Sequence, residues 1–172
     1  MSNNLDNVVL IGMPGAGKST LGVVLAKILG YEFIDADLLI QSKLDKTLQK
    51  IIDACGPDGF IEVENEVLCT LNASHAVVAT GGSAVYSDEA MNHLKSIGTV
   101  VYLRVSYEEL ESRLGGLHER GVVMKSGMGM SLSDLYEERR PLYEKYADLT
   151  IDIDGLSVRD AARRLVDQLS ML

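Results

Sequence analysis

The sequence predicts an α/β protein in which helices cover both faces of a parallel β-sheet. Short segments rich in Val and Ile alternate with segments of helical apolar spacing, which is the pattern of repeated strand–helix units. A glycine-rich loop stands between the first strand-like segment and the first helix-like one. The 172 residues are enough for one substantial core, so we expect a single domain over residues 1–172.

The strand-like segments are short and rich in β-branched residues. They fall at residues 7–11, 33–37, 75–80, 99–105 and 149–153. The segments with helical spacing lie between and after them. They fall at residues 20–30, 39–54, 60–71, 88–96, 106–114, 131–147 and 157–169. This alternation predicts three layers, with the sheet between two layers of helices.

One long segment fits neither strand nor helix spacing. Residues 115–130 read GGLHERGVVMKSGMGM and lie between two predicted helices. A connection of this length inside a compact domain usually has a function, so we expect a mobile lid over residues 113–131. The alternative is a surface loop without a function.

Composition and charge limit the classes of partner. A chain with a net charge of −9 lacks the basic surface that a nucleic-acid backbone requires, so we expect no nucleic-acid partner. No apolar tract is long enough to cross a membrane, and the first residues contain neither a basic leader nor a cleavage site. The two cysteines, Cys55 and Cys69, do not have metal-binding spacing. We therefore expect a cytoplasmic protein with reduced thiols and no membrane partner.

The glycine-rich loop GMPGAGKST carries a complete GxxxxGK[ST] pattern between a strand and a helix. The backbone N–H groups of such a loop and the start of the following helix suit phosphate groups, which predicts that the chain binds ATP. We expect Lys18 to reach the β- and γ-phosphates and Ser19 to ligate Mg²⁺. The alternative is a glycine-rich turn without a ligand. The predicted nucleotide-binding residues of the loop are Gly12, Gly15, Ala16, Gly17, Lys18, Ser19 and Thr20.

Two acidic residues, Asp35 and Asp37, stand at the end of the second strand-like segment. Residues at i and i+2 on a strand share a face, so both carboxylates are expected to point into one crevice at the carboxyl edge of the sheet. One carboxylate can hold the metal while the other accepts a hydrogen bond from the attacking hydroxyl. The alternative is that both are turn or capping residues.

Several arginines follow in the second half of the chain. Phosphoryl transfer spreads negative charge over the equatorial oxygens, and an arginine delivered by a closing lid stabilises that charge. Arg120, inside the predicted lid, is the candidate for this catalytic role. Arg139 and Arg140 lie in a helical segment beside two glutamates, so surface salt bridges are an alternative interpretation of that pair.

Taken together, the motifs resemble those of the shikimate kinases over nearly the whole chain. They are the loop GMPGAGKST, FIDAD, GFxxxE at residues 59–64, ATGG at residues 79–82 and ERRPLYEKYAD at residues 138–148. The resemblance implies a P-loop fold with five parallel strands in the order 2-3-1-4-5, an acceptor-binding region at residues 32–72, a lid, and a monomer. It also implies phosphorylation of shikimate to shikimate 3-phosphate in aromatic amino-acid biosynthesis.

On the acceptor side, the resemblance gives roles to three residues. Asp37 matches the carboxylate that contacts the acceptor hydroxyls and takes part in catalysis. Gly82 matches a backbone contact to the acceptor, and Arg139 matches an arginine that binds the acceptor carboxylate.

On the nucleotide side, the resemblance again implies ATP and Mg²⁺. Lys18 and Ser19 match the phosphate and metal positions, and Asp35 then lies near the metal. Arg120 is similar to the lid arginine, and Arg113 is similar to the arginine that stacks on adenine.

The departures from the family pattern fall on the acceptor and the lid. Ile61 follows Phe60 where the family carries an arginine that binds the shikimate carboxylate, and an aliphatic side chain cannot form that bidentate pair. We expect Ile61 to form a new hydrophobic wall of the acceptor site. Ser83 replaces the third glycine of the family, and the sequence after Arg120 also differs. The ATP side matches the family without such changes.

These departures leave other functions open. The first alternative is a kinase for another small alcohol, such as homoserine or gluconate. The second is a nucleotide-binding regulator that has lost catalysis, although such a protein should have gaps among the P-loop, carboxylate and arginine positions. A switch GTPase would need DxxG and NKxD segments, which we do not find in suitable places.

Overall fold

The computed structural model describes residues 7–114 and 130–172, in which five parallel strands form one sheet. The strands are β1 (Asn7–Ile11), β2 (Glu32–Asp35), β3 (Ala76–Ala79), β4 (Thr99–Arg104) and β5 (Leu149–Asp152). Their order is β2-β3-β1-β4-β5, which confirms the expected sheet and its strand order. In the register of the sheet, Val9 of the central strand β1 pairs with Val78 on β3 and with Val100 on β4.

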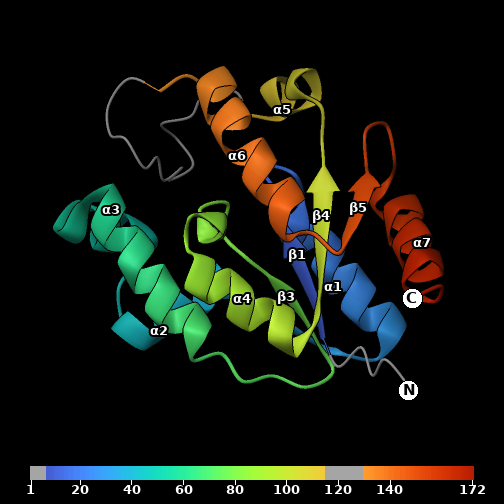
Figure 1. Ribbon diagram of the computed structural model, residues 1–172, viewed down its shortest axis with the longest axis horizontal. Helices are drawn as coiled ribbons and strands as arrows, with labels where there is room; N and C mark the ends of the chain where they lie inside the picture. The colour runs from blue at the N-terminus through green and yellow to red at the C-terminus, as the bar shows by residue number, and fades with distance from the viewer. Residues whose placement is uncertain (1–6, 115–129) are drawn as a thin grey trace.

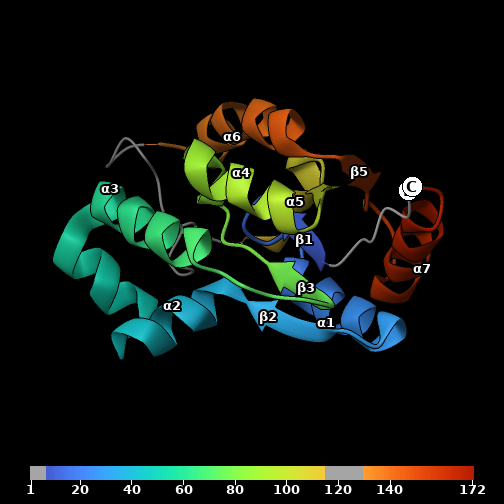
Figure 2. The same cartoon turned by 60° about the horizontal axis from the view of Figure 1, so that its bottom comes forward.

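Helices cover both faces of this sheet. They are α1 (Lys18–Leu29), α2 (Ala36–Leu44), α3 (Leu48–Cys69), α4 (Asp88–Ile97), α5 (Tyr107–Arg113), α6 (Leu132–Tyr146) and α7 (Val158–Leu169), with a short 3₁₀ helix η1 (Ala84–Tyr86). Figures 1 and 2 show α4 and α6 on one side of the sheet and α1, which packs against α7, on the other. The pair α2 and α3 projects to one side of the sheet in Figure 2. The predicted three layers are therefore present.

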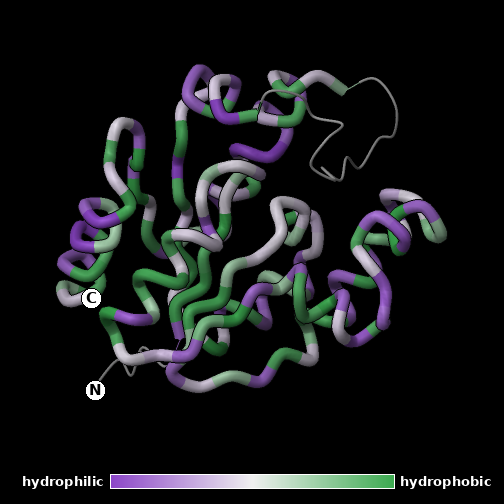
Figure 3. The backbone as a smooth tube through the Cα atoms, turned by 180° about the vertical axis from the view of Figure 1, so that it is seen from behind, coloured by the Kyte–Doolittle hydropathy of each residue, from purple (hydrophilic) through white to green (hydrophobic). Residues whose placement is uncertain are grey.

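The core follows from the hydrophobic strands. Every residue of β1 and β3 is buried, and Figure 3 shows mostly hydrophobic strands at the centre of the molecule. A second, smaller cluster joins α2 to α3 through Ile40, Ile51, Phe60 and Val67. This cluster fixes the projecting helix pair. In the described parts of the chain, no helix is both long and apolar enough to cross a membrane.

The end of the second strand differs from the prediction. The strand ends at Asp35, and Asp37 lies in the first turn of α2 rather than on the strand. The Asp35 side chain caps this helix, accepting hydrogen bonds from the backbone N–H groups of Asp37 and Leu38 at 3.0 and 3.2 Å. This cap favours the start of a helix directly after Asp35, because it gives hydrogen-bond partners to N–H groups of the first helical turn. The expectation that both carboxylates share one strand face is therefore wrong.

The predicted helix at residues 39–54 is also wrong. α2 ends at Leu44, and Thr47 begins α3 with a side-chain oxygen that accepts from the Lys50 N–H group at 3.4 Å. α3 then runs to Cys69, but its helical backbone is interrupted where the sequence predicts a separation between two helices. Gly56, with a φ of 72°, is not helical and is followed by Pro57, so the two parts of α3 meet at a kink. Residues 115–129, which hold most of the predicted lid and Arg120, lie outside the described residues.

Candidate active site

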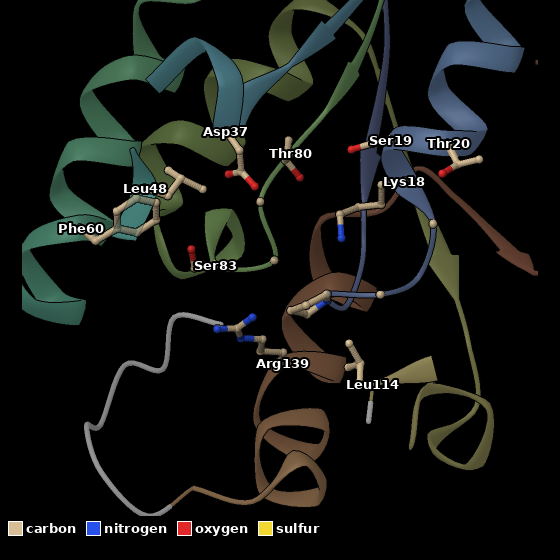
Figure 4. Close-up of a pocket in the computed structure, with 15 residues that line it drawn as sticks. Lys18, Ser19, Thr20, Asp37, Leu48, Phe60, Thr80, Ser83, Leu114 and Arg139 are labelled. Carbon is tan, nitrogen blue, oxygen red and sulfur yellow. The ribbon is translucent and has the colours of Figure 1, made fainter. Parts of the chain in front are cut away.

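A pocket of about 310 Å³ opens where the loops after β1, β2 and β3 meet. Its lining comes from the glycine-rich loop, α1, α2, α3, the turn after β3, and α6. In Figure 4, Lys18, Asp37 and Arg139 enter it from three different helices, and Leu48 and Phe60 of α3 form an apolar side. Segments far apart in the sequence therefore meet in one pocket that has both charged and apolar walls.

The glycine-rich loop has the conformation expected of a phosphate site. Gly12, Gly15 and Gly17 have φ angles of 150°, 81° and 91°, which residues other than glycine rarely adopt. Gly17 is the residue immediately before α1, and the first turn of α1 contains no acidic side chain. The N–H groups of a helix start have no intrahelical partners and attract anions. The loop, with the residues around it, can therefore receive a phosphate chain.

Lys18 is the buried cation of the loop. Only 8% of the residue is exposed, and its Nζ donates hydrogen bonds to the backbone oxygens of Gly12 and Met13, each at 2.8 Å. Burial lowers the pKa of this ammonium to about 8, while the nearby Asp37 carboxylate opposes the shift. The structure thus places Lys18 where the sequence predicts it, and its role in binding phosphate stays a prediction.

Ser19 and Asp35 offer oxygen ligands for a metal ion. The Ser19 hydroxyl donates to Oδ2 of Asp35 at 2.8 Å, and the Ser19 side chain lies at the exposed rim of the pocket. Within residues 7–114 and 130–172, no group of three or more His, Cys, Asp or Glu side chains forms a metal cluster. Mg²⁺ does not need one, since it takes one or two protein oxygens together with nucleotide phosphates and water. These two residues therefore fit Mg²⁺ bound with a nucleotide.

Asp37 is the carboxylate that faces the middle of the pocket. Burial and the neighbouring Asp35 raise its pKa above the ordinary value, while Lys18 acts in the opposite direction. Gly81, in the turn after β3, approaches it closely: a Cβ atom added there would lie 3.1 Å from Oδ1 of Asp37. The pocket therefore holds a carboxylate of increased basicity within reach of the P-loop lysine.

Arg139 is a fully buried arginine on α6, with 0% exposure. Its Nε donates to the Tyr86 hydroxyl at 3.1 Å, and its guanidinium carbon lies 5.1 Å from the centre of the Tyr86 ring. A Cβ atom added at Gly82 would lie 2.8 Å from one of its terminal nitrogens. By contrast, the neighbouring Arg140 is exposed and pairs with Glu137 at 3.3 Å. Of this pair of arginines, Arg139 lines the pocket and Arg140 belongs to the surface.

Glu64 is a site residue that the sequence interpretation missed. It is 1% exposed on α3, and its Oε2 accepts a hydrogen bond from the Ser83 hydroxyl at 2.6 Å. A Cβ atom added at Gly81 would lie only 2.6 Å from its Oε1. Burial raises the pKa of this carboxyl to about 7, the Ser83 hydrogen bond opposes the shift, and Asp37 adds to it. The sequence signal was its place as the acidic residue of the GFxxxE segment at residues 59–64, to which no role was assigned.

The remaining predicted residues are placed as follows. Arg113 pairs with Glu109 at 2.8 Å, and one of its terminal nitrogens lies 3.4 Å from the backbone oxygen of Ala16, beside the P-loop. Ile61 is half-buried and packs against the small cluster that contains Phe60. Gly82 lines the pocket. The contacts of Arg113 with adenine and of Ile61 with an acceptor stay predictions.

The raised pKa of Glu64 predicts a pH-dependent stability. Protonated Glu64 contributes stability fully below its ordinary pKa of 4.5, and this contribution is lost as the pH rises through about 7. Glu64→Gln cannot ionise, so between pH 4.5 and 8 the wild type should lose about 3 kcal/mol of unfolding free energy relative to the variant. Urea unfolding of both proteins across this range measures the difference. Parallel pH profiles would contradict the assignment of a buried titrating carboxyl.

The fold and pocket define a P-loop phosphotransferase. The chain belongs to the shikimate kinase family, whose model matches residues 14–170. It is 37% identical to the shikimate kinase of Vibrio parahaemolyticus over 95% of both chains. It is also 37% identical to that of Thiobacillus denitrificans over 97% of this chain and 92% of the relative. The structure is similar to that of Acinetobacter baumannii shikimate kinase in complex with shikimate, with a TM-score of 0.84, 32% identity, and coverage of 97% and 94%.

Proposed function

We propose that this chain transfers the γ-phosphoryl group of ATP to a hydroxyl of shikimate and so forms shikimate 3-phosphate. The observation that carries the proposal is the meeting of Lys18, Asp37 and Arg139 in one pocket. The first belongs to the phosphate loop, the second can accept a proton, and the third can bind a carboxylate. Membership of the shikimate kinase family supports this choice of acceptor.

In this proposal the residues assigned to the site have separate tasks. Lys18 neutralises charge on the β- and γ-phosphates. Asp37 accepts a hydrogen bond from the attacking hydroxyl and takes its proton as the bond to phosphorus forms. Arg139 holds the acceptor carboxylate, Gly82 adds a backbone contact, and Arg120, in the proposed lid, supplies a second positive charge to the transferred group. In-line positioning accounts for most of the acceleration.

Mg²⁺ is the proposed metal, held by Ser19 directly and by Asp35 directly or through water. When bound with ATP, it neutralises charge on the phosphates. We propose residues 32–72 as the acceptor-binding region and residues 113–131 as the lid. The proposed state is a monomer in the cytoplasm, where both cysteines, which are free in the structure, stay reduced.

Ile61 gives one reason to compare other acceptors. It lacks the charge that a family arginine would offer to a carboxylate, so homoserine and gluconate are the alternative substrates. We expect ADP release, measured in a coupled assay, to be fastest with shikimate. Assays without an acceptor and with GTP as donor serve as controls. Faster turnover of homoserine or gluconate would overturn the proposed acceptor, and no turnover with any alcohol would favour the nucleotide-binding regulator.

A further inference from the structure

We propose that Ser83 and Glu64 are positioning residues of the acceptor site. Their hydrogen bond holds the turn after β3 (residues 80–83) against α3. A cation at position 61 could bind Glu64 in place of Ser83. This inference rests on the proposed function, because it deepens the description of how the same pocket selects its acceptor. Neither side chain needs to touch the substrate for this role, because both act through the turn.

The turn is tied to the rest of the molecule at three points. The Thr80 hydroxyl donates to the backbone of β1 at 3.0 Å. The Tyr143 hydroxyl of α6 donates to the backbone oxygen of Gly82 at 2.7 Å. The third tie is the bond from Ser83 to Glu64 at 2.6 Å, and both of these residues are buried. It is the tie that connects the turn to α3, which carries the apolar side of the pocket.

The position of this turn matters because its glycines lie against the charged side chains of the pocket. A Cβ atom added to Gly81 would lie 3.1 Å from Oδ1 of Asp37, and one added to Gly82 would lie 2.8 Å from a guanidinium nitrogen of Arg139. With such close approach, a small shift of the turn would change the space in which an acceptor lies between Asp37 and Arg139. Misplacement of reacting groups by about 1 Å can reduce rates by about 100-fold.

Position 61 is linked to the same pair by helix geometry. Ile61 lies three residues before Glu64 on α3, and side chains three residues apart are neighbours on a helix. Its aliphatic side chain offers no donor, and Oε1 of Glu64 has no hydrogen-bond partner in the described part of the chain. The groups that face this carboxyl are Ser83, Asp37 of α2, Arg139 of α6 and Lys18 of α1. An arginine at position 61 could reach Oε1, so it and Ser83 are alternative partners of Glu64.

A double-mutant cycle of Ile61→Arg and Ser83→Ala tests this linkage. In the wild-type background, Ser83→Ala should raise KM for shikimate by about tenfold, because it leaves a buried carboxyl oxygen without its donor. KM for ATP should change by less than about twofold, since the bond lost is between Ser83 and Glu64 and involves no residue of the P-loop. In the Ile61→Arg background, the same substitution should raise KM for shikimate by less than about twofold.

Ser87→Ala is the matched control. It removes a hydrogen bond from Ser87 to Asn65, which also joins α3 to the segment after β3 but lies outside the pocket lining. A purely structural loss should lower the melting temperature in both variants, whereas only Ser83→Ala should raise KM for shikimate. Ser83→Gly provides a second variant of the same bond if Ser83→Ala does not fold.

Two kinetic results would overturn the inference. One is an unchanged KM for shikimate in the Ser83 variants, and the other is an equal rise in both backgrounds. The cycle is measured with shikimate and with any acceptor that the wild type phosphorylates faster, so a wrong acceptor and a wrong pairing give different results. Urea unfolding of the same variants measures the coupling between positions 61 and 83 as a change in unfolding free energy, without an activity assay. Additive changes in unfolding free energy would count against the pair even in a protein without kinase activity.

Discussion

Lys18→Ala should abolish measurable turnover while leaving the protein folded. Lys18 supplies the buried positive charge at the P-loop, where its Nζ lies 2.8 Å from the backbone oxygens of Gly12 and Met13. Loss of one charge that stabilises the transferred phosphoryl group lowers kcat by about 1,000-fold or more. The fold should persist because a buried ammonium has a desolvation penalty, which the substitution removes. Steady-state kinetics at saturating ATP and shikimate, together with thermal melting, measure both effects.

Lys27→Ala is the control for this substitution. Lys27 lies in the last turn of the same helix, is exposed, and does not line the pocket. Its variant should retain wild-type kcat. Near-normal activity of Lys18→Ala would contradict the assignment of the P-loop as the site of phosphoryl transfer. A collapse of the melting temperature in Lys18→Ala would instead show that the two backbone hydrogen bonds are structural.

The sheet could be predicted because its signal is local. Val-rich segments such as those around Val9, Val78 and Val100 are buried on both faces, so each is almost continuously apolar. The order of the strands came from the family resemblance, since strand spacing alone does not set it. The helix boundaries near Asp35 and Thr47 could not be placed, because short capping side chains compete there with strand and helix continuation.

The site was predicted where a motif fixes the backbone and missed where contacts are made across the fold. The P-loop residues follow one another in sequence, so their pattern alone indicates the chemistry. Helical spacing alone could not separate Arg139 from Arg140, and only the family resemblance did, because adjacent residues leave α6 in different directions and only Arg139 is buried. Glu64 was missed for the same reason: Ser83, its partner, lies 19 residues away. Only the packing of α3 against the turn after β3 shows that the two residues form a pair.

Asp37→Asn should lower kcat by about 100-fold or more while changing KM for ATP little. The amide has nearly the shape of the carboxylate, so the acceptor can still bind, but it cannot take the proton of the attacking hydroxyl. The wild type should lose activity as the pH falls through the pKa of Asp37, which burial and Asp35 raise above the ordinary value. This acidic limb should be absent from the residual activity of the variant. Initial rates at saturating substrates from pH 4.5 to 8 measure both effects.

Asp53→Asn is the matched control, because Asp53 is an exposed carboxylate on the neighbouring helix α3 that accepts a hydrogen bond from Gln49 at 2.8 Å. An amide oxygen can accept the same bond, so this variant should keep wild-type kcat and the acidic limb. If Asp37→Asn lost affinity for the acceptor and kept its kcat, Asp37 would be a binding group rather than a base. If it kept both, Asp37 would have no part in the transfer. The proton would then leave the hydroxyl by way of solvent.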